Sequence, residues 1–511
     1  MTDENANKVI SNRELFSGWR IARNTVWNFS GIVAPLLVAV FTVPLLIVGM
    51  GKERFGLLSI IWMGVGYLSL FDMGLGRALT RLIAERLGKN QIDEMGQIIW
   101  TALWLMLGLG FIGALTGVCG SGPLVHSVLK VTPDLVHEGV LSFCILSCSL
   151  PIVILTSGII GILEAHQKFA VITIVRIPMG AVTFLGPLIT LQFSPSLVLA
   201  TSVLVVTRTI ALVVYFVSAM RYEASLRTPL GVDRTHLRPL FSFGGWLTVT
   251  NIVSPLMVYI DRFFIGAILS LTAVAYYTTP YDMLSRIQIV PQAIIGVLFP
   301  AFSAAAGSMR SAHEAIRLYN QSAKTLLFVM LPFAGVAFFT APDLLRLWLG
   351  ADFAIHATNV VRWICIGLVI NSVARVPFVV LQSVGHPDFV AKMHLAEIIP
   401  YIAMLYFLTK YFGITGTAAA WTLRMVLDTA GLNAIIYFRN PEYRDSVKWS
   451  LGATLIVTLC FAGSWWMTNW VLRYLLLCSF GVIYLCAGRI YFSEQISSVM
   501  RKFREESLSR V

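Results

Sequence analysis

The sequence predicts an all-α polytopic membrane protein with about 14 transmembrane helices, arranged as two pseudo-symmetric six-helix bundles followed by two C-terminal helices. Hydrophobic residues make up 57% of the 511 positions, charged residues only 13%, and the mean hydropathy is +0.78. A soluble protein of this length needs far more polar surface. The apolar residues form continuous runs and do not alternate as in a membrane β-barrel. The two halves of the chain also resemble each other.

Apolar runs long enough to cross a hydrocarbon core of about 30 Å as helices follow one another along most of the chain. They lie at residues 25–48, 55–76, 97–118, 138–161, 171–191, 196–219, 243–268, 273–302, 319–340, 360–382, 393–410, 413–437, 449–467 and 470–490. The segments between them are too short for a soluble catalytic or nucleotide-binding domain, and the phosphate-binding loop motif of ATPases is absent. The seven cysteines and eight histidines lack metal-ligand spacing, so we expect no metal, no other cofactor and no catalytic residue.

Lys and Arg are distributed unevenly between the two sides that the spans define. Five arginines lie within spans, and 26 of the other 33 Lys and Arg fall on the side of the N-terminus. Because cytoplasmic loops are enriched in these residues, we expect both termini to be cytoplasmic. The same bias accounts for the net charge of +12, which favours contact with anionic lipid headgroups and not with nucleic acid.

Four short correspondences relate the two halves at a nearly constant offset. They pair the starts of spans 1 and 7, the outer turns that follow, the turns 163–169 and 381–389, and the pairs Thr207-Arg208 and Leu423-Arg424. Chance similarity between apolar segments is the alternative. Repeats of six spans have the same orientation, and the sites of such proteins lie near the midplane between the halves. The predicted domains are an N-terminal bundle (1–220), a C-terminal bundle (221–440), and two accessory helices with a cytoplasmic tail (441–511).

One arginine lies near the middle of the predicted span 413–437. Arg424 is eleven residues from Gly413, which is about 16 Å along a helix. Such a charge costs about 2.5–3.5 kcal/mol even on a lenient insertion scale, so it should face a cavity or a partner. Asp428, four residues further on the same helix face, is the alternative partner.

Several stretches are more specific than their hydropathy. They are FGLL at 55–58 with FDMGLGRAL at 71–79, YIDRFFIG at 259–266 with AYY at 275–277, LLRLWLGADF at 344–353 and GITGTAAAW at 413–421. In this order they resemble the polysaccharide transporter family, the O-antigen-type flippases of the multidrug/oligosaccharidyl-lipid/polysaccharide exporter superfamily. The resemblance covers most of spans 1–12.

This resemblance implies two six-helix bundles that form a V around a central cavity. It also implies a flippase that moves an undecaprenyl-pyrophosphate-linked oligosaccharide across the bacterial inner membrane by alternating access, for O-antigen (lipopolysaccharide), capsule or exopolysaccharide biosynthesis. The partners would be this substrate, membrane lipids and polysaccharide polymerase machinery. Because no nucleotide site is expected, a gradient of H⁺ or Na⁺ would drive transport.

The family has no universal signature, so we choose candidate site residues by charge and depth. For a pyrophosphate and sugar cavity we predict Arg208, Arg424, Arg375 and Arg286, since guanidinium groups match diphosphate oxygens in geometry and charge. Arg208 and Arg424 occupy equivalent repeat positions. Each could instead have a structural role, and Asp282 could neutralise Arg286 from one helical turn away.

For gating or ion coupling we predict Asp261, Arg262, Asp72 and Glu397. Asp261 and Arg262 point about 100° apart on a helix and need separate partners, and a packing role is equally open. Asp72 occupies the position equivalent to Arg286. Glu397 has no basic residue near it in sequence and could carry a coupling proton, or it could lie in a wet cavity mouth. Glu164 is interpreted as a solvated loop residue.

Two alternatives come from other functional classes. A multidrug or cation antiporter of the same superfamily would favour acidic cavity residues, whereas the charge within these spans is mainly basic. A membrane-embedded polysaccharide polymerase or ligase would need acidic catalytic residues in a large outer loop, and the loops here are short. The sequence therefore predicts a transporter and not an enzyme.

Overall fold

The computed structural model describes residues 35–68, 74–88, 95–228, 231–233, 257, 259–292, 294–295, 298, 302, 312–383, 387–465, 469–486 and 488–489. Helices are the regular elements of this part of the chain, which contains no strand and so confirms the all-α prediction. Packing divides the chain into two units, Met1–Ala275 and Tyr276–Val511. The predicted boundaries after residues 220 and 440 rest on the sequence repeat and stay a prediction.

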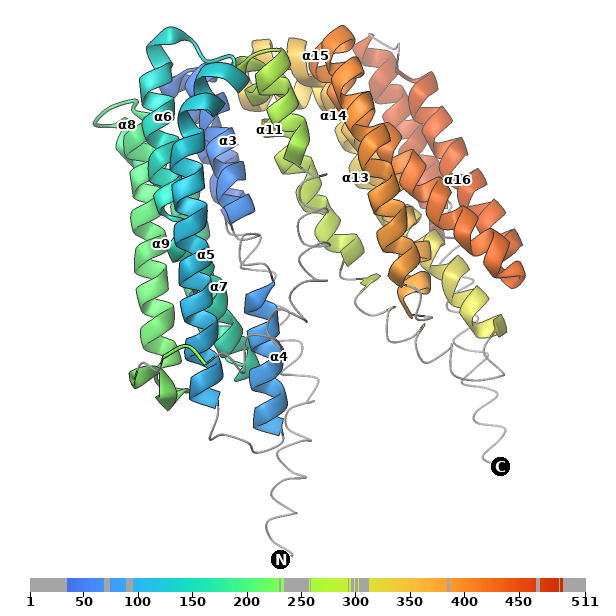
Figure 1. Ribbon diagram of the computed structural model, residues 1–511. Coiled ribbons are helices and arrows are strands. Elements are labelled where there is room, and N and C mark those ends of the chain that lie inside the picture. Colours follow the sequence, from blue (N-terminus) through green and yellow to red (C-terminus); the bar gives the residue numbers. More distant parts are fainter. Residues whose placement is uncertain are drawn as a thin grey trace, which may run out of the picture. The chain divides into compact units, whose positions relative to one another are not determined.

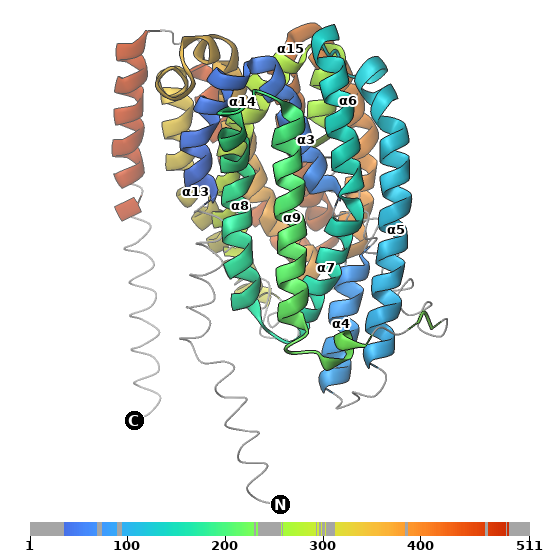
Figure 2. The same cartoon turned by 90° about the vertical axis from the view of Figure 1, so that its left-hand side faces the viewer.

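The first unit is a bundle of apolar helices, of which α5, α6, α8 and α9 are seen along their length in Figure 2. Its helices are Pro35–Met50, α3 (Lys52–Leu68), α4 (Leu75–Gly88), α5 (Met95–Pro123), the π-helical turn η2 (Leu124–Val128), α6 (Pro133–Cys148), α7 (Leu150–Ala165), α8 (Phe169–Leu191), α9 (Leu197–Ala219), the 3₁₀ turn η3 (Ala224–Arg227), 259–268, and the start of α11 (Leu271–Ser285).

Helix α4 packs against α7 through one face. Leu75, Ala78, Leu79 and Ile83 are at most 1% exposed, and their spacing of three and four residues places them on one side of a helix. Gly161 of α7 allows the close approach, because a Cβ atom there would lie 2.7 Å from the Gly76 carbonyl oxygen. The two helices can therefore bring polar side chains of their flanks together.

The second unit contains the remainder of α11 and the longest helices. Its elements are the 3₁₀ turn η5 (Arg286–Gln288), α13 (Ala312–Leu349), α14 (Ala351–Ser383), α15 (Pro387–Arg439), the 3₁₀ turn η6 (Pro441–Tyr443), α16 (Arg444–Gly463) and the apolar helix Trp470–Cys486. Helix α14 packs against both α13 and α15 (Figure 1). Since it is enclosed from two sides, most of its side chains are buried.

Helix α15 consists of two antiparallel segments joined at Gly413. This residue has φ 60° and ψ −146°, a backbone conformation that is essentially restricted to glycine. Four residues to either side, the hydroxyl oxygens of Thr409 and Thr417 lie 2.8 Å apart and tie the segments together. The two adjacent runs 393–410 and 413–437 predicted from the sequence are thus the two arms of this hairpin.

The helices have the length and composition of membrane spans. Eight of those in the described residues are long and apolar enough to cross a bilayer, and each of the fourteen predicted runs overlaps a described helix. The chain is a multi-pass membrane protein. The number of fourteen spans stays a prediction.

Candidate functional site

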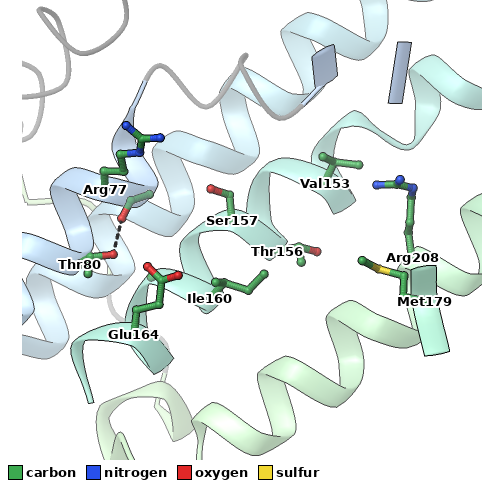
Figure 3. A pocket seen from close by; sticks show the side chains of 11 residues that line it. Arg77, Thr80, Val153, Thr156, Ser157, Ile160, Glu164, Met179 and Arg208 are labelled. Atoms are coloured by element: carbon green, nitrogen blue, oxygen red, sulfur yellow. Dashed lines mark hydrogen bonds between the residues drawn. The ribbon is translucent and has the colours of Figure 1, made fainter. Parts of the chain in front are cut away.

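A cavity of about 330 Å³ with both polar and apolar walls lies within the first unit (Figure 3). Helices α4, α7, α8 and α9 contribute the side chains around it. These residues are Gly76, Arg77, Thr80, Val153, Thr156, Ser157, Ile160, Gly161, Glu164, Met179 and Arg208. The cavity therefore combines two guanidinium groups, one carboxyl group and three hydroxyl groups with an apolar remainder.

Helix α7 supplies the longest wall of this cavity. Its contributions recur every three or four residues from Val153 to Glu164, so they share one face of the helix. The Thr156 hydroxyl donates to the carbonyl oxygen of Ile152 at 2.6 Å, and that of Thr80 on α4 donates to Gly76 at 3.0 Å. Both oxygen atoms still have lone pairs that can accept a hydrogen bond from a ligand.

The charges of the cavity are placed at different depths. Arg208 is the middle residue of α9 and lies about 16 Å from either helix end. It is half-buried, whereas Arg77 is exposed near the start of α4 and Glu164 lies in the last turn of α7. None of the three has an ion-pair partner within 4 Å among the described residues. The cavity thus carries an excess positive charge from the helix ends to the middle of the bundle.

A histidine–carboxylate hydrogen bond connects the turns that follow α7 and α9. His166, directly after α7, lies 3.3 Å from the Glu223 carboxylate, which follows α9. Glu223 also accepts hydrogen bonds from the backbone N–H of Ser225 at 3.2 Å and from its hydroxyl at 2.7 Å. Burial raises the pKa of Glu223, but the hydrogen bonds from His166 and Ser225 outweigh this effect and lower it below the ordinary value. The anchor fixes the helices that carry Glu164 and Arg208.

A second group of charges lies within the α15 hairpin of the other unit. The Arg424 Nε atom is 3.5 Å from a carboxylate oxygen of Glu397, and His394 Nε2 is 3.4 Å from one of Asp428. His394 and Glu397 are three residues apart on the first arm, while Arg424 and Asp428 are four apart on the second. Each pair therefore lies on one helix face, and antiparallel packing joins the arms through the Arg424–Glu397 ion pair and the His394–Asp428 contact.

Three of these four groups are buried, whereas His394 is half-buried. Glu397 is 3% exposed, Asp428 7% and Arg424 8%. The Arg424 guanidinium also lies 5.3 Å from the centre of the Tyr401 ring, at cation–π distance. Arg375 of α14 lies close enough to Asp428 for their charges to interact, and it donates to the Gln288 side-chain oxygen at 3.2 Å. The cluster consequently has nearly balanced charge.

The other predicted site residues are distributed over the chain. Arg286 is exposed at the start of η5. Asp261 and Arg262 are buried, at 0% and 1% exposed, and the Asp261 carboxylate accepts from the Arg262 backbone N–H at 2.8 Å. The Arg262 guanidinium stacks over Tyr259 at 4.7 Å. Asp72 lies outside the described residues. Of these predicted residues, Arg424 and Glu397 form an ion pair, and Arg375 lies near Asp428 in the same cluster.

Some residues of the cavity and of the α15 charge cluster were not recognised as site residues in the sequence. The interpretation of Glu164 as a loop residue is wrong, since it belongs to α7 and lines the cavity. The spacing of Thr156 and Ser157 relative to Glu164, on one face of an apolar helix, was a usable signal. Arg77 was counted only as a topological charge. His394 had no signal, because its partner lies on the other arm of a hairpin.

Sequence comparison identifies the family to which this chain belongs. Residues 21–306 match the family described as polysaccharide biosynthesis protein. A protein of Shigella flexneri, named as a candidate O-antigen transporter, is 31% identical over 416 residues, which cover 80% of this chain and 96% of the relative. The chain belongs to the polysaccharide biosynthesis protein family. The resemblance noted in the sequence is thereby confirmed.

Solved structures of low sequence identity share the fold of this polysaccharide biosynthesis protein. One is a multidrug resistance transporter of the MATE family in an inward-facing conformation, with a TM-score of 0.64 and 15% sequence identity. The alignment covers 85% of this chain and 95% of the transporter chain. The lipid II flippase MurJ, in an inward closed conformation, has a TM-score of 0.64 at 14% identity and covers 93% of this chain and 100% of its own. The chain therefore has the same fold as these two transporters.

Proposed function

We propose that this family member is a flippase that moves an undecaprenyl-pyrophosphate-linked oligosaccharide across the bacterial inner membrane for surface polysaccharide biosynthesis. The observation that carries the proposal is the cavity of the first unit. Arg208 lines this cavity from the middle of α9, and its guanidinium has no ion-pair partner among the described residues. The name of the Shigella flexneri relative supports the same class of substrate.

The chemistry of this cavity suits a diphosphate joined to a sugar. Arg208 and Arg77 can donate paired hydrogen bonds to phosphate oxygens, which are strong when both partners are charged. The hydroxyl groups of Thr156 and Ser157 lie between these arginines in Figure 3 and can exchange hydrogen bonds with sugar hydroxyls. A volume of about 330 Å³ is at the lower end for small-molecule sites, so the polyprenyl chain would stay in the lipid.

The ion pairs of the α15 hairpin provide a route for coupling to a proton gradient. Glu397 holds the Arg424 guanidinium at 3.5 Å in a buried site. Protonation of Glu397 would remove its charge and release Arg424 to bind an anion, so substrate affinity would differ between the two protonation states. Such differential affinity is what a coupled carrier requires. Arg375 would strengthen the same positive field.

The proposed orientation follows from the distribution of Lys and Arg. With both termini in the cytoplasm, the end of the cavity near Arg77 and Glu164 would open towards the cytoplasmic leaflet, where the substrate is made. The product would be handed to polysaccharide polymerase machinery on the periplasmic side. In this orientation the anionic substrate would bind on the cytoplasmic side and be released on the periplasmic side.

The two other functional classes receive less support. A carrier of cationic drugs would need an excess of carboxylates, whereas the described cavity of the first unit has two arginines and one glutamate. The likeness to a multidrug transporter concerns the fold alone, at 15% identity. The relative that shares 31% of its residues is named for transport, which supports a transporter and not a polymerase or ligase.

The proposal is tested by replacing Arg208 in protein reconstituted in vesicles that contain a labelled lipid-linked oligosaccharide. We expect Arg208→Gln to slow transfer about tenfold or more, because a hydrogen bond to a charged group contributes about 1.5–3 kcal/mol. Arg208→Lys should retain part of the rate, since it keeps the charge but loses the paired donors. Arg221→Gln is the matched control, as Arg221 is exposed just after α9 and does not line the cavity. Wild-type transfer by Arg208→Gln protein would contradict the proposal.

A further inference from the structure

A second cavity, of about 640 Å³, lies within the second unit and shares no lining residue with the cavity of the first unit. The end of α13, the start of α14 and the helix Trp470–Cys486 surround it. The residues that line it are Pro342, Asp343, Arg346, Ala354, Ile355, Thr358, Asn359, Arg362, Trp470 and Arg473. Among these residues three are arginines and one is an acid, so the cavity is strongly positive.

The single carboxylate of this lining is already engaged. Asp343 lies 3.1 Å from a terminal nitrogen of Arg473 and accepts a hydrogen bond from the Tyr474 hydroxyl at 3.4 Å. Arg473 is 6% exposed and also donates to the Phe339 carbonyl oxygen at 3.3 Å. The charge of Asp343 thus balances Arg473, and the described lining holds no second carboxylate for the other two arginines.

Arg362 is a buried charge with no counterion within 4 Å in the part of the chain that the structure describes. It is 8% exposed and donates to the Trp465 carbonyl oxygen at 2.9 Å, and its guanidinium lies 5.5 Å from the Phe338 ring. No carboxylate lies within 4 Å of it in the described residues, and its buried Nε atom has no acceptor there. It is also near enough to Arg473 for the like charges to repel. A buried charge in this state is costly unless an anion joins it.

The rim of the cavity combines charge with apolar surface. Arg346 is exposed, as are Ile355 at 75% and Trp470 at 66%. In a multi-pass membrane protein such apolar side chains face acyl chains, and tryptophan favours the headgroup level. The cavity therefore offers guanidinium donors next to a surface for lipid tails.

We infer that this cavity binds the phosphate group of an anionic membrane lipid, with Arg362 and Arg346 as its ligands. Guanidinium groups bind phosphate oxygens through paired charge-assisted hydrogen bonds, and the Arg362 guanidinium lies beside the Phe338 and Trp465 rings, at 5.5 Å and 5.8 Å from their centres. The apolar rim favours a lipid over free phosphate as the source. The inference does not depend on the transported substrate, because no residue of the Arg208 cavity or of the α15 ion pairs takes part.

The test measures lipid binding by the purified full-length protein in a neutral detergent, through native mass spectrometry and thermal unfolding. The probes are phosphatidylglycerol, the zwitterionic phosphatidylcholine and inorganic phosphate. We expect phosphatidylglycerol to bind more tightly than phosphatidylcholine and its affinity to fall about tenfold or more in Arg346→Gln and Arg362→Gln, since each removes charge-assisted hydrogen bonds. Arg444→Gln is the control, because Arg444 also donates to a backbone carbonyl, at 3.3 Å, but does not line the cavity.

Two outcomes decide the source of the phosphate and one overturns the inference. Loss of phosphatidylglycerol binding in the variants, without competition by inorganic phosphate, supports the lipid. Displacement of the lipid by millimolar phosphate supports a phosphate site that soluble anions also fill. Unchanged phosphatidylglycerol affinity in Arg346→Gln, which is exposed and should fold normally, and in Arg362→Gln refutes the site.

Discussion

The ion pair between Glu397 and Arg424 allows a quantitative test of how the second unit holds buried charge. At their separation of 3.5 Å, the attraction is about 5 kcal/mol for an effective dielectric constant near 20. Desolvation offsets much of it, but removal of one partner leaves the other buried and unbalanced, which typically costs about 3–5 kcal/mol. We therefore expect Arg424→Gln to lower the free energy of unfolding by about 3–5 kcal/mol. Glu397→Gln should be milder, because Asp428 can take over part of the role.

The assay is a double-mutant cycle on the free energy of unfolding, measured by denaturant titration in mixed micelles. The variant Glu397→Gln/Arg424→Gln should be more stable than the sum of the single losses predicts, by about 1–3 kcal/mol. The exposed pair of Asp388 and Lys392 on the same helix is the control, with an expected coupling of about 0.3–0.5 kcal/mol. Additive losses for the buried pair, within about 0.5 kcal/mol, would refute the interaction.

Three further predictions concern the first unit and the hairpin. Gly161→Val should destabilise the protein by about 1–3 kcal/mol in thermal unfolding, because its side chain would collide with α4. Gly108→Ala is the control and should be neutral or slightly stabilising, since open space surrounds Gly108. Equal effects of the two substitutions would contradict the close packing of α4 and α7. Gly413→Ala should cost about 1–3 kcal/mol through its backbone conformation alone, since nothing lies within 4 Å of its Cβ position, and an unchanged unfolding midpoint would argue against this turn. Glu223→Gln should lower the free energy of unfolding at neutral pH. Because the pKa of Glu223 is lowered in the folded protein, this loss should shrink as the pH falls below the ordinary glutamate pKa of about 4.3. A loss that does not change with pH would exclude an ionised carboxylate.

The helices and the depth of the charged residues could be predicted from the sequence. An apolar run in a bilayer must form a helix, because its backbone polar groups find no water there and have to pair with each other. The position of Arg208 or Arg424 within its run then predicts the depth of that residue in the membrane. Family membership also followed from short stretches in a fixed order. These features depend on local sequence, so they need no knowledge of packing.

The pairing of the charges could not be predicted in this way. Glu397 lies sixteen residues before Gly413 and Arg424 eleven after it, so their contact depends on how the two arms of α15 are offset against each other. That register is set by packing along the whole interface. The same holds for Glu164, which reaches the cavity of the first unit because Gly161 lets α4 approach α7. Rotation and register of helices are decided by tertiary contacts, which hydropathy does not record.

Transfer of a lipid-linked oligosaccharide by the purified wild-type protein tests the central proposal most directly. In vesicles loaded with an undecaprenyl-pyrophosphate oligosaccharide on one leaflet, a soluble glycosidase or lectin detects the sugar when it reaches the other side. We predict transfer well above that of protein-free vesicles, faster when a proton gradient is imposed, and inhibited by a soluble diphosphate sugar. Transfer at the protein-free rate by folded protein, with a gradient of either sign, would contradict the proposed flippase.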